Sequence, residues 1–341
     1  MGDRSRTAKI LGRGVLALAL LLAWLWSFGG VWFLRGTPWG GWPAWLFAGT
    51  SLGVLLVSRR AAVAWVLLSF LGVSIWFATL EPRNDRDWRP ELAVAPTAEI
   101  DGDRVTVRNV RNFDFHAEEE FTPHYEDRSY DLARLDSLDA AFSYWGGNTR
   151  IAHTMLSFGF AGRDYLTLSV EVRRERGEGW GGLPGLYKQF EVIYVLGDER
   201  DLIRQRTNAR GEDLYLYPIR ADRDGIRAVF LETLRIVNEL AERPDWYGTL
   251  ERNCFTSLLR IFRAARPGSP PNPSLYVLMN GSVPALLYQL GRIDTDLPFE
   301  EAHRAFYMTD VARTFDDAPD FSQRLRAART DAARLKGIAA P

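Results

Sequence analysis

The residue best suited to chemistry is Cys254, the only cysteine in 341 residues. It follows Asn253 and opens a short apolar-periodic segment, 253–265, that stops before Pro267. Asparagine is a common N-cap, so the sequence predicts a helix whose first residue is Cys254. The helix dipole and the free N–H groups at such a start favour thiolate, and the same N–H groups can hold an oxyanion. This position is typical of a nucleophile.

A thiol nucleophile needs a base, and histidine is the usual one. His153 lies in the first of two alternating runs, 151–160 and 164–173, which predict a β-hairpin. A turn near Ala161 would place Ser169 opposite His153 and Glu171 diagonal to it, so that either could orient the ring. The other three histidines lie in charged or C-terminal segments: His116, His124 and His303.

The residues alone leave two further interpretations open. Cys254 could be a small buried hydrophobe and His153 a hydrogen-bonded core residue, in a tethered binding domain without catalysis. Four aromatic residues flank the two segments, and they could pack in the core or line a substrate path: Tyr144, Trp145, Trp246 and Tyr247. The glycine-rich stretch 177–185 predicts a mobile loop that gates a cleft.

No cofactor is predicted. The sequence has neither an HExxH motif nor a cysteine cluster, so we expect no metal site. The net charge of −1 gives no electrostatic reason to expect a nucleic-acid partner.

Three apolar runs precede these elements and predict a membrane region over residues 1–80, with helices at about 14–34, 42–58 and 61–80. One anchor followed by a buried helical hairpin is the alternative. A polar, proline-bearing linker follows at 81–100. Residues 101–341 then combine strand and helix patterns into one α+β domain with a helical C-terminal extension. Within it, the run 131–142 could form a short helix.

Basic residues set the expected orientation. They precede the first apolar run and recur between the second and third, whereas the intervening loop has only Arg35: Arg4, Arg6, Lys9, Arg13, Arg59 and Arg60. The positive-inside rule then places the N-terminus in the cytoplasm, and three crossings place the α+β domain in the periplasm of a bacterial inner-membrane protein. That compartment is oxidising, and a lone cysteine there cannot pair within its own chain.

The chain also resembles a known family over about Asp103 to Arg266. The matching segments include "SYWGGNTRIAHTMLSFGF", "GLYKQFEVIYVLGDERDLIRQRTN" and "LAERPDWYGTLERNCFTSLLR". The family is the periplasmic domain family named after the bacterial lipoprotein N-acyltransferase Lnb. The resemblance implies a permuted papain/NlpC-like fold with a mostly antiparallel sheet packed on helices, and it carries a strand histidine and a helix cysteine onto His153 and Cys254.

The resemblance further implies a membrane-anchored thiol acyltransferase that uses a cysteine–histidine dyad. It would move an acyl chain from the phospholipid bilayer, through a Cys254 thioester, to an amine such as a lipoprotein N-terminus. The Asn253–Cys254 step is similar to that of the lecithin:retinol acyltransferase group. The alternative is a periplasmic cysteine peptidase or amidase that acts on peptidoglycan. An apolar groove would favour the transferase, and a polar groove would favour the amidase.

Overall fold

The structure is a computed structural model that describes residues 2–34, 41–266, 279–316 and 318–337, with the side chains of 2–6 and 330–337 left aside. It divides into two compact units. Unit 1 holds Met1–Pro82 together with Trp180–Phe190, and unit 2 holds Arg83–Gly179 and Glu191–Pro341. One division therefore falls after Pro82, and a later segment of the chain, Trp180–Phe190, also belongs to unit 1.

Unit 1 contains three helices: α1 (Gly2–Trp32), α2 (Trp42–Val57) and α3 (Arg59–Thr79). An aromatic and polar cluster joins them at mid-length. The indole N–H groups of Trp24 and Trp65 both donate to the Ser51 hydroxyl, at 3.0 and 2.9 Å. These bonds satisfy polar groups that could not reach water within a bilayer.

The structure corrects the prediction of three spanning helices to two candidates. Among the described residues, 7–32 of α1 and all of α3 are long and apolar enough to cross a membrane. The helix α2 has 16 residues, which extend about 24 Å at about 1.5 Å per residue, short of a hydrocarbon core of about 30 Å. Arg35 and the loop 35–40 lie outside the described residues, and so do the side chains of Arg4 and Arg6.

Unit 2 is built on an eight-stranded sheet in the order β1-β2-β9-β8-β7-β6-β10, with β5 also paired to β2. All neighbouring strands are antiparallel except β2 and β9, which confirms the expected α+β class with a mostly antiparallel sheet. The strands are β1 (Thr97–Asp101), β2 (Arg104–Arg111), β5 (Tyr125–Asp131), β6 (Leu135–Tyr144), β7 (His153–Phe160), β8 (Asp164–Arg173), β9 (Glu191–Gly197) and β10 (Asp213–Pro218). A separate pair is formed by β3 (Asp114–Phe115) and β4 (Phe121–Thr122).

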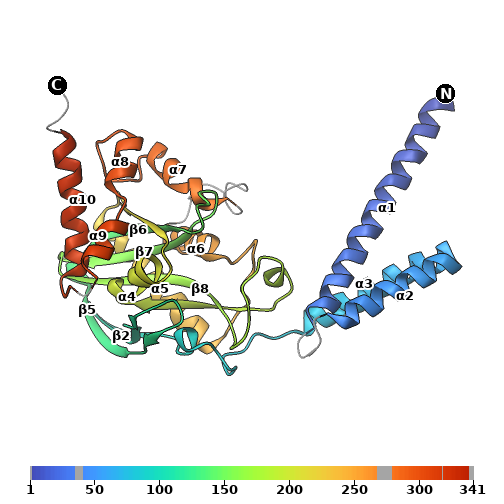
Figure 1. The fold of residues 1–341 in the computed structure, drawn as a ribbon, viewed down its shortest axis with the longest axis horizontal. Helices are drawn as coiled ribbons and strands as arrows, with labels where there is room; N and C mark the ends of the chain where they lie inside the picture. The colour runs from blue at the N-terminus through green and yellow to red at the C-terminus, as the bar shows by residue number, and fades with distance from the viewer. Residues whose placement is uncertain (1, 35–40, 267–278, 317, 338–341) are drawn as a thin grey trace. The chain divides into compact units, whose positions relative to one another are not determined.

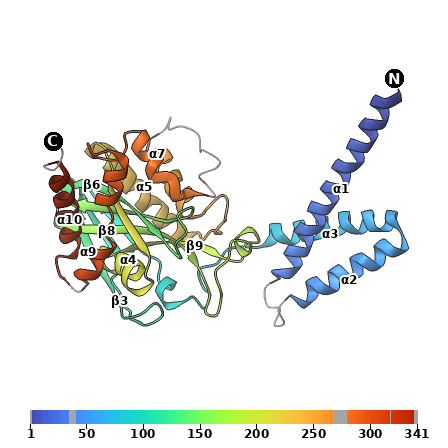
Figure 2. The ribbon, with the colours of Figure 1, turned by 45° about the horizontal axis from the view of Figure 1, so that its top comes forward.

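Helices cover both faces of this sheet (Figure 1 and Figure 2). On one face α5 and α6 bury apolar residues against Leu156, Phe158 and Leu168. On the other face α4, α9 and α10 pack against Met155 and its neighbours. The helices are α4 (Glu199–Arg204), α5 (Arg223–Glu242), α6 (Cys254–Ala265), α7 (Val283–Gln289), α8 (Phe299–Ala305), α9 (Thr309–Thr314) and α10 (Phe321–Gly337).

The run 131–142 is not the short helix that its leucine spacing suggested. After one 3₁₀ turn (Leu132–Arg134) it forms β6, a central strand between β7 and β10. A strand buried on both faces does not alternate in polarity, so its pattern is easily mistaken for a helical one. Asp139 in this strand pairs with Arg326 and Arg329 of α10, which explains a carboxylate at a buried position.

The segment expected as a linker, 81–100, is largely folded into unit 2. Trp88 is buried and lies under the Arg173 guanidinium, 4.4 Å from the ring centroid. Arg173 also donates to the backbone carbonyls of Leu92 and Ala93. A buried arginine therefore fixes this polar segment against the sheet, and β1 follows it directly.

Candidate active site

The helix α6 begins at Cys254 with Asn253 as its N-cap, as the sequence predicts. Asn253 Oδ1 accepts from the Thr256 backbone N–H at 2.9 Å, and the Thr256 hydroxyl accepts from the Asn253 N–H at 2.9 Å. Asn253 Nδ2 also donates to the Thr249 carbonyl. This capping box fixes the first turn of the helix and holds the half-buried thiol at its positive end.

His153 is the first residue of β7 and is 8% exposed. It lies close enough to Cys254 for a hydrogen bond between the two side chains, and for one from the Thr154 backbone, to lower the pKa of the thiol. Two residues that lie 101 positions apart in the sequence are thus brought to one site. Sequence reasoning selected this pair among four histidines.

Ser169 and Glu171 hold the other side of the imidazole ring. His153 Nε2 lies 2.7 Å from Ser169 Oγ and 3.3 Å from Glu171 Oε1, and the Ser169 hydroxyl donates to Glu171 Oε1 at 2.6 Å. A hydroxyl has one proton to give. Because Ser169 gives its proton to Glu171, it accepts from the Nε2–H of His153, and Nδ1 is left unprotonated for the thiol.

The register of the hairpin differs from the expected one by two residues. Ser169 pairs with Met155 rather than with His153. The turn is centred on Gly162 rather than on Ala161, since Phe160 pairs with Asp164, and Ala161 and Gly162 are both at positive φ. Since side chains alternate with a period of two, a two-residue shift keeps Ser169 and Glu171 on the expected face.

Sequence reasoning missed Arg206, which completes the cluster. It lies in a π-helical turn (Gln205–Ala209) after α4 and is buried. Its Nη2 donates to Glu171 Oε1 at 2.7 Å, and its Nη1 lies 3.5 Å from Glu212 Oε1. Glu212 in turn accepts from the Ser143 hydroxyl at 2.5 Å. The signal in the sequence was weak, because "RQRTN" carries two arginines and no periodicity marks the buried one.

Asn280 was also missed, and it fixes the start of β7. Its side-chain amide accepts from the Ala152 N–H at 3.0 Å and donates to the Ala152 carbonyl at 2.6 Å. Next to it, Gly281 approaches the backbone so closely that an added Cβ would lie 2.1 Å from the Thr149 carbonyl oxygen. The two hydrogen bonds from Asn280 position Ala152, the residue immediately before His153.

The electrostatics of the cluster favour the charged form of the dyad. Burial alone would raise the pKa of the Cys254 thiol, but the hydrogen bond and the charge of His153 lower it below its ordinary value. Burial and Arg206 act to lower the pKa of His153, but Glu171 and the hydrogen bond to the thiol outweigh them, so that the pKa is raised. Burial opposes the Glu171 carboxylate, but Arg206 and His153 hold its pKa well below the usual range. The arrangement can therefore support a thiolate–imidazolium pair.

The four aromatic residues divide into two groups. Tyr247 lies near the site, since burial and the Cys254 charge both raise its pKa. Tyr144 is buried and donates to the Gly281 carbonyl at 2.8 Å. Trp145 is half-buried after β6, and the Trp246 backbone forms a bridge with Glu191.

The remaining histidines lie elsewhere. His116 contacts the Thr122 hydroxyl and His124 is exposed. His303 stacks on Tyr215 at 4.2 Å and bonds the Tyr217 hydroxyl through Nδ1. In the described part of the chain, no group of three or more His, Cys, Asp or Glu residues could hold a metal ion.

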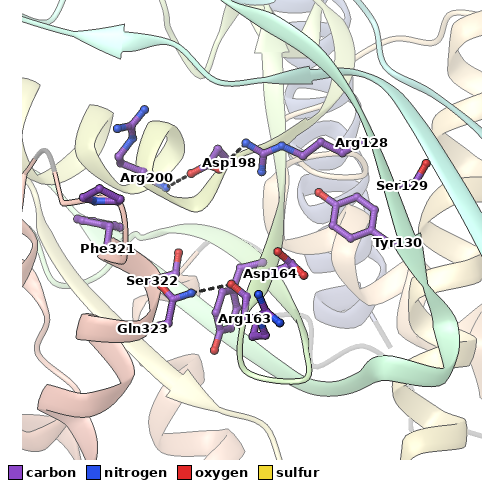
Figure 3. Close-up of a pocket in the computed structure, with 12 residues that line it drawn as sticks. Arg128, Ser129, Tyr130, Arg163, Asp164, Asp198, Arg200, Phe321, Ser322 and Gln323 are labelled. Atoms are coloured by element: carbon purple, nitrogen blue, oxygen red, sulfur yellow. Dashed lines mark hydrogen bonds and ion pairs between the residues drawn. The ribbon is translucent and has the colours of Figure 1, made fainter.

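A large polar pocket of about 520 Å³ lies at the other end of the hairpin (Figure 3). Arg128 and Asp198 form an ion pair at 2.7 Å beside the hairpin turn at Arg163. The seven steps between His153 and Phe160 extend about 23 Å at about 3.3 Å each. This pocket is therefore separate from the dyad.

The structure combines two features: an α+β domain that brings together a thiol, an imidazole and a carboxylate, and a helical unit with two candidate membrane spans. These features are typical of a membrane-associated protein with a thiol site. Residues 121–281 match the family model of the Lnb N-terminal periplasmic domain. This part of the chain is therefore similar to the Lnb periplasmic domain, which confirms the resemblance seen in the sequence. Comparison with curated proteins and with solved structures found no match.

Proposed function

We propose that the protein is a cysteine-dependent acyltransferase of the bacterial inner membrane. The observation that carries this proposal is the hydrogen bond between Cys254, at a helix start, and His153, whose far nitrogen is held by Ser169 and Glu171. The Lnb match over residues 121–281 supports the same reaction class. The order of a strand histidine before a helix cysteine also agrees with a permuted papain/NlpC-like fold.

In the first step, His153 Nδ1 takes the thiol proton and Cys254 attacks the ester carbonyl of a phospholipid. The S–C bond forms, the C–O bond breaks, and the lysophospholipid alkoxide leaves with the proton from His153. The N–H groups at the start of α6 stabilise the oxyanion. In the second step a neutral amine attacks the thioester, the C–N bond forms, the C–S bond breaks and the proton of the amine passes to His153, which restores the thiolate–imidazolium pair. A lipoprotein N-terminus is the acceptor that the family suggests.

Exposed apolar side chains beside the dyad favour an acyl chain over a polar substrate. Ile151 precedes His153 by two residues and Leu250 precedes Cys254 by four, and both are exposed. Met279, also exposed, adjoins the Asn280 contact with the start of β7. Each of these three side chains lies within four residues, in the sequence, of a member of the dyad or of its support Asn280, and an apolar partner would suit them.

The orientation proposed here has a cytoplasmic N-terminus and a periplasmic unit 2. The C-terminal ends of α1 and α3 lie together, since an added Cβ on Gly30 would meet Val73 at 2.4 Å. In this orientation both helices run in the same direction, which requires α2 to return the chain across the bilayer between them. The shortfall in the length of α2 would be met by local thinning of the bilayer. Lys9 and Arg13 near the start of α1, and Arg59 and Arg60 at the start of α3, then share one side. That side is cytoplasmic by the positive-inside rule.

The test uses cells that lack other lipoprotein N-acyltransferases. Mass spectrometry of a lipoprotein N-terminus should show the amide-linked chain with the wild-type protein and not with Cys254→Ala or His153→Ala. His116→Ala, which removes an exposed histidine, should retain acylation. Acylation that persists in Cys254→Ala removes the lipoprotein assignment.

The second candidate is a peptidase or amidase acting on peptidoglycan, with water in place of the amine. The same dyad serves both reactions, and the exposed polar residues 146–150 beside β7 would suit a glycopeptide. Purified protein and muropeptides separate the two candidates. Cleavage that depends on Cys254, without lipoprotein acylation, would select the amidase.

A further inference from the structure

We propose that the β8–β9 segment, Trp180–Phe190, is a membrane-interface element that inserts Trp180 and Leu183 into the surface of the lipid bilayer. The segment joins β8 to β9 within unit 2, yet it belongs to unit 1 with the apolar helices. The proposal is independent of the reaction that Cys254 catalyses. It requires only that the helices of unit 1 lie in a membrane.

An aromatic socket on α1 holds one end of the segment. The Tyr187 ring stacks on Trp26 at 5.0 Å and lies 5.1 Å from the Phe33 ring. Gly29 makes room for it, because an added Cβ there would lie 2.1 Å from the Tyr187 hydroxyl oxygen. Tyr187 is only 9% exposed as a result. The glycine is therefore a requirement of this contact.

Lys188 makes a second attachment, at the end of α3. Its Nζ donates to the Phe77 carbonyl at 3.0 Å and lies 4.6 Å from the centroid of the Phe77 ring. Phe77 is in the last turn of α3, where carbonyl groups lack intrahelical partners. A cation at this end also interacts favourably with the helix dipole and the aromatic face.

Both attachments fix the depth of the segment relative to the helices. Gly29 lies three residues before Trp32, the last residue of α1, and Phe77 is in the last turn of α3. The ends of membrane helices lie at the interface, where tryptophan and tyrosine are enriched and lysine reaches toward water. The segment is therefore held at interface depth on the side where the chain leaves α3.

Two large apolar side chains of the segment are largely exposed. Trp180 is 58% exposed and Leu183 is 66% exposed. At a helix end their natural environment is the boundary between lipid headgroups and acyl chains, which suits an amphipathic indole. The continuity of this surface with the apolar helices identifies the bilayer as the partner. The segment thus differs from the gating loop that its glycines suggested, since Tyr187 and Lys188 anchor it.

The test places an environment-sensitive dye at single cysteines in a Cys254→Ser background, in the full chain reconstituted into phospholipid liposomes. Dye at Trp180→Cys or Leu183→Cys should emit at shorter wavelength and be quenched several-fold more by lipids with a spin label near the headgroup than dye at Leu290→Cys. Leu290 is a matched control in unit 2 with the same 58% exposure as Trp180. Equal emission and quenching at all three positions would overturn the proposal.

A second comparison tests the socket. Gly29→Leu should displace Tyr187 and reduce the quenching at residue 183, whereas Gly49→Leu should leave it unchanged, because an added Cβ at Gly49 meets nothing within 4 Å. Quenching that is insensitive to Gly29→Leu would contradict the anchoring. Neither readout depends on acyl transfer, so these results and those of the acylation test are separable.

Discussion

Replacing Glu171 with glutamine tests whether the negative charge of Glu171 stabilises the His153 imidazolium and, through it, the Cys254 thiolate. The side chain keeps its shape, and the carbonyl oxygen of glutamine can still accept from Arg206 and Ser169. The hydrogen-bond directions therefore persist, and His153 keeps Nδ1 free for Cys254. What is lost is the negative charge 3.3 Å from His153 Nε2.

The size of the effect follows from that distance. Two unit charges 3.3 Å apart interact by about 5 kcal/mol at an effective dielectric constant of about 20. Arg206 lies 2.7 Å from the same carboxylate oxygen and offsets part of this attraction. A hydrogen bond to a charged group contributes about 1.5–3 kcal/mol net, which corresponds to about a 10- to 150-fold fall in the thiolate–imidazolium population.

Iodoacetamide alkylation measures this population, because the chain has one cysteine and intact mass reports its modification directly. Without the Glu171 charge the pKa of His153 falls, the imidazolium is less populated, and the pKa of Cys254 rises. Alkylation of Glu171→Gln should therefore slow near neutral pH and recover as the pH increases. Glu212→Gln, which removes the other carboxylate of Arg206, should change the profile far less.

His153→Ala should shift the Cys254 profile upward by more than Glu171→Gln does, and Ser169→Ala should fall between wild type and His153→Ala. The reasoning is refuted if Glu171→Gln follows the wild-type profile while His153→Ala shifts it. In that outcome the carboxylate does not stabilise the imidazolium.

Three further predictions concern the surroundings of the dyad. Arg206→Met leaves Glu171 and Glu212 without their buried cation, so it should cost about 3–5 kcal/mol and lower the thermal midpoint; Arg206→Met combined with Glu171→Gln should recover part of the loss, and no recovery would contradict the pairing. Asn253→Ala removes the capping box of α6 and should cost about 1 kcal/mol, whereas Asn253→Ser should retain most of the stability; equal midpoints for the two variants would argue against the cap. The pKa of Glu171 is depressed below its model-compound value of 4.5, so the unfolded chain binds more protons as the pH falls through this range and the carboxylate's contribution to stability is lost in acid. The difference in thermal midpoint between wild type and Glu171→Gln should therefore narrow from neutral to acidic pH, and a constant difference would contradict the shift.

Cys254 and His153 could be predicted from local sequence patterns because each lies in a helix or strand that such a pattern specifies. Asn253 followed by Cys254 at the start of an amphipathic segment specifies a capped helix, and the structure begins α6 at that residue. The alternation around His153 specifies a strand, and β7 begins there. Since side chains alternate with a period of two, even a register error of two residues kept Ser169 and Glu171 on the correct face.

The remaining features depend on tertiary context that local patterns do not encode. Arg206 is buried only because Glu171 and Glu212 meet it there. The strand β6 looked helical because it is covered on both faces and carries Asp139 for partners in α10. The contact between Tyr187 and Trp26 of α1 joins residues more than 150 positions apart, and no hydrophobic periodicity in the sequence predicts such a contact.

The central claim is that Cys254 carries an acyl chain as a thioester, and one measurement tests it directly. Purified protein in phospholipid liposomes, without an amine acceptor, is analysed by intact mass. We predict a fatty-acyl adduct on Cys254 that hydroxylamine removes. The adduct should be absent from Cys254→Ala and should form much more slowly in His153→Ala. A wild-type protein whose thiol reacts with iodoacetamide yet never gains an acyl adduct from phospholipid would contradict it.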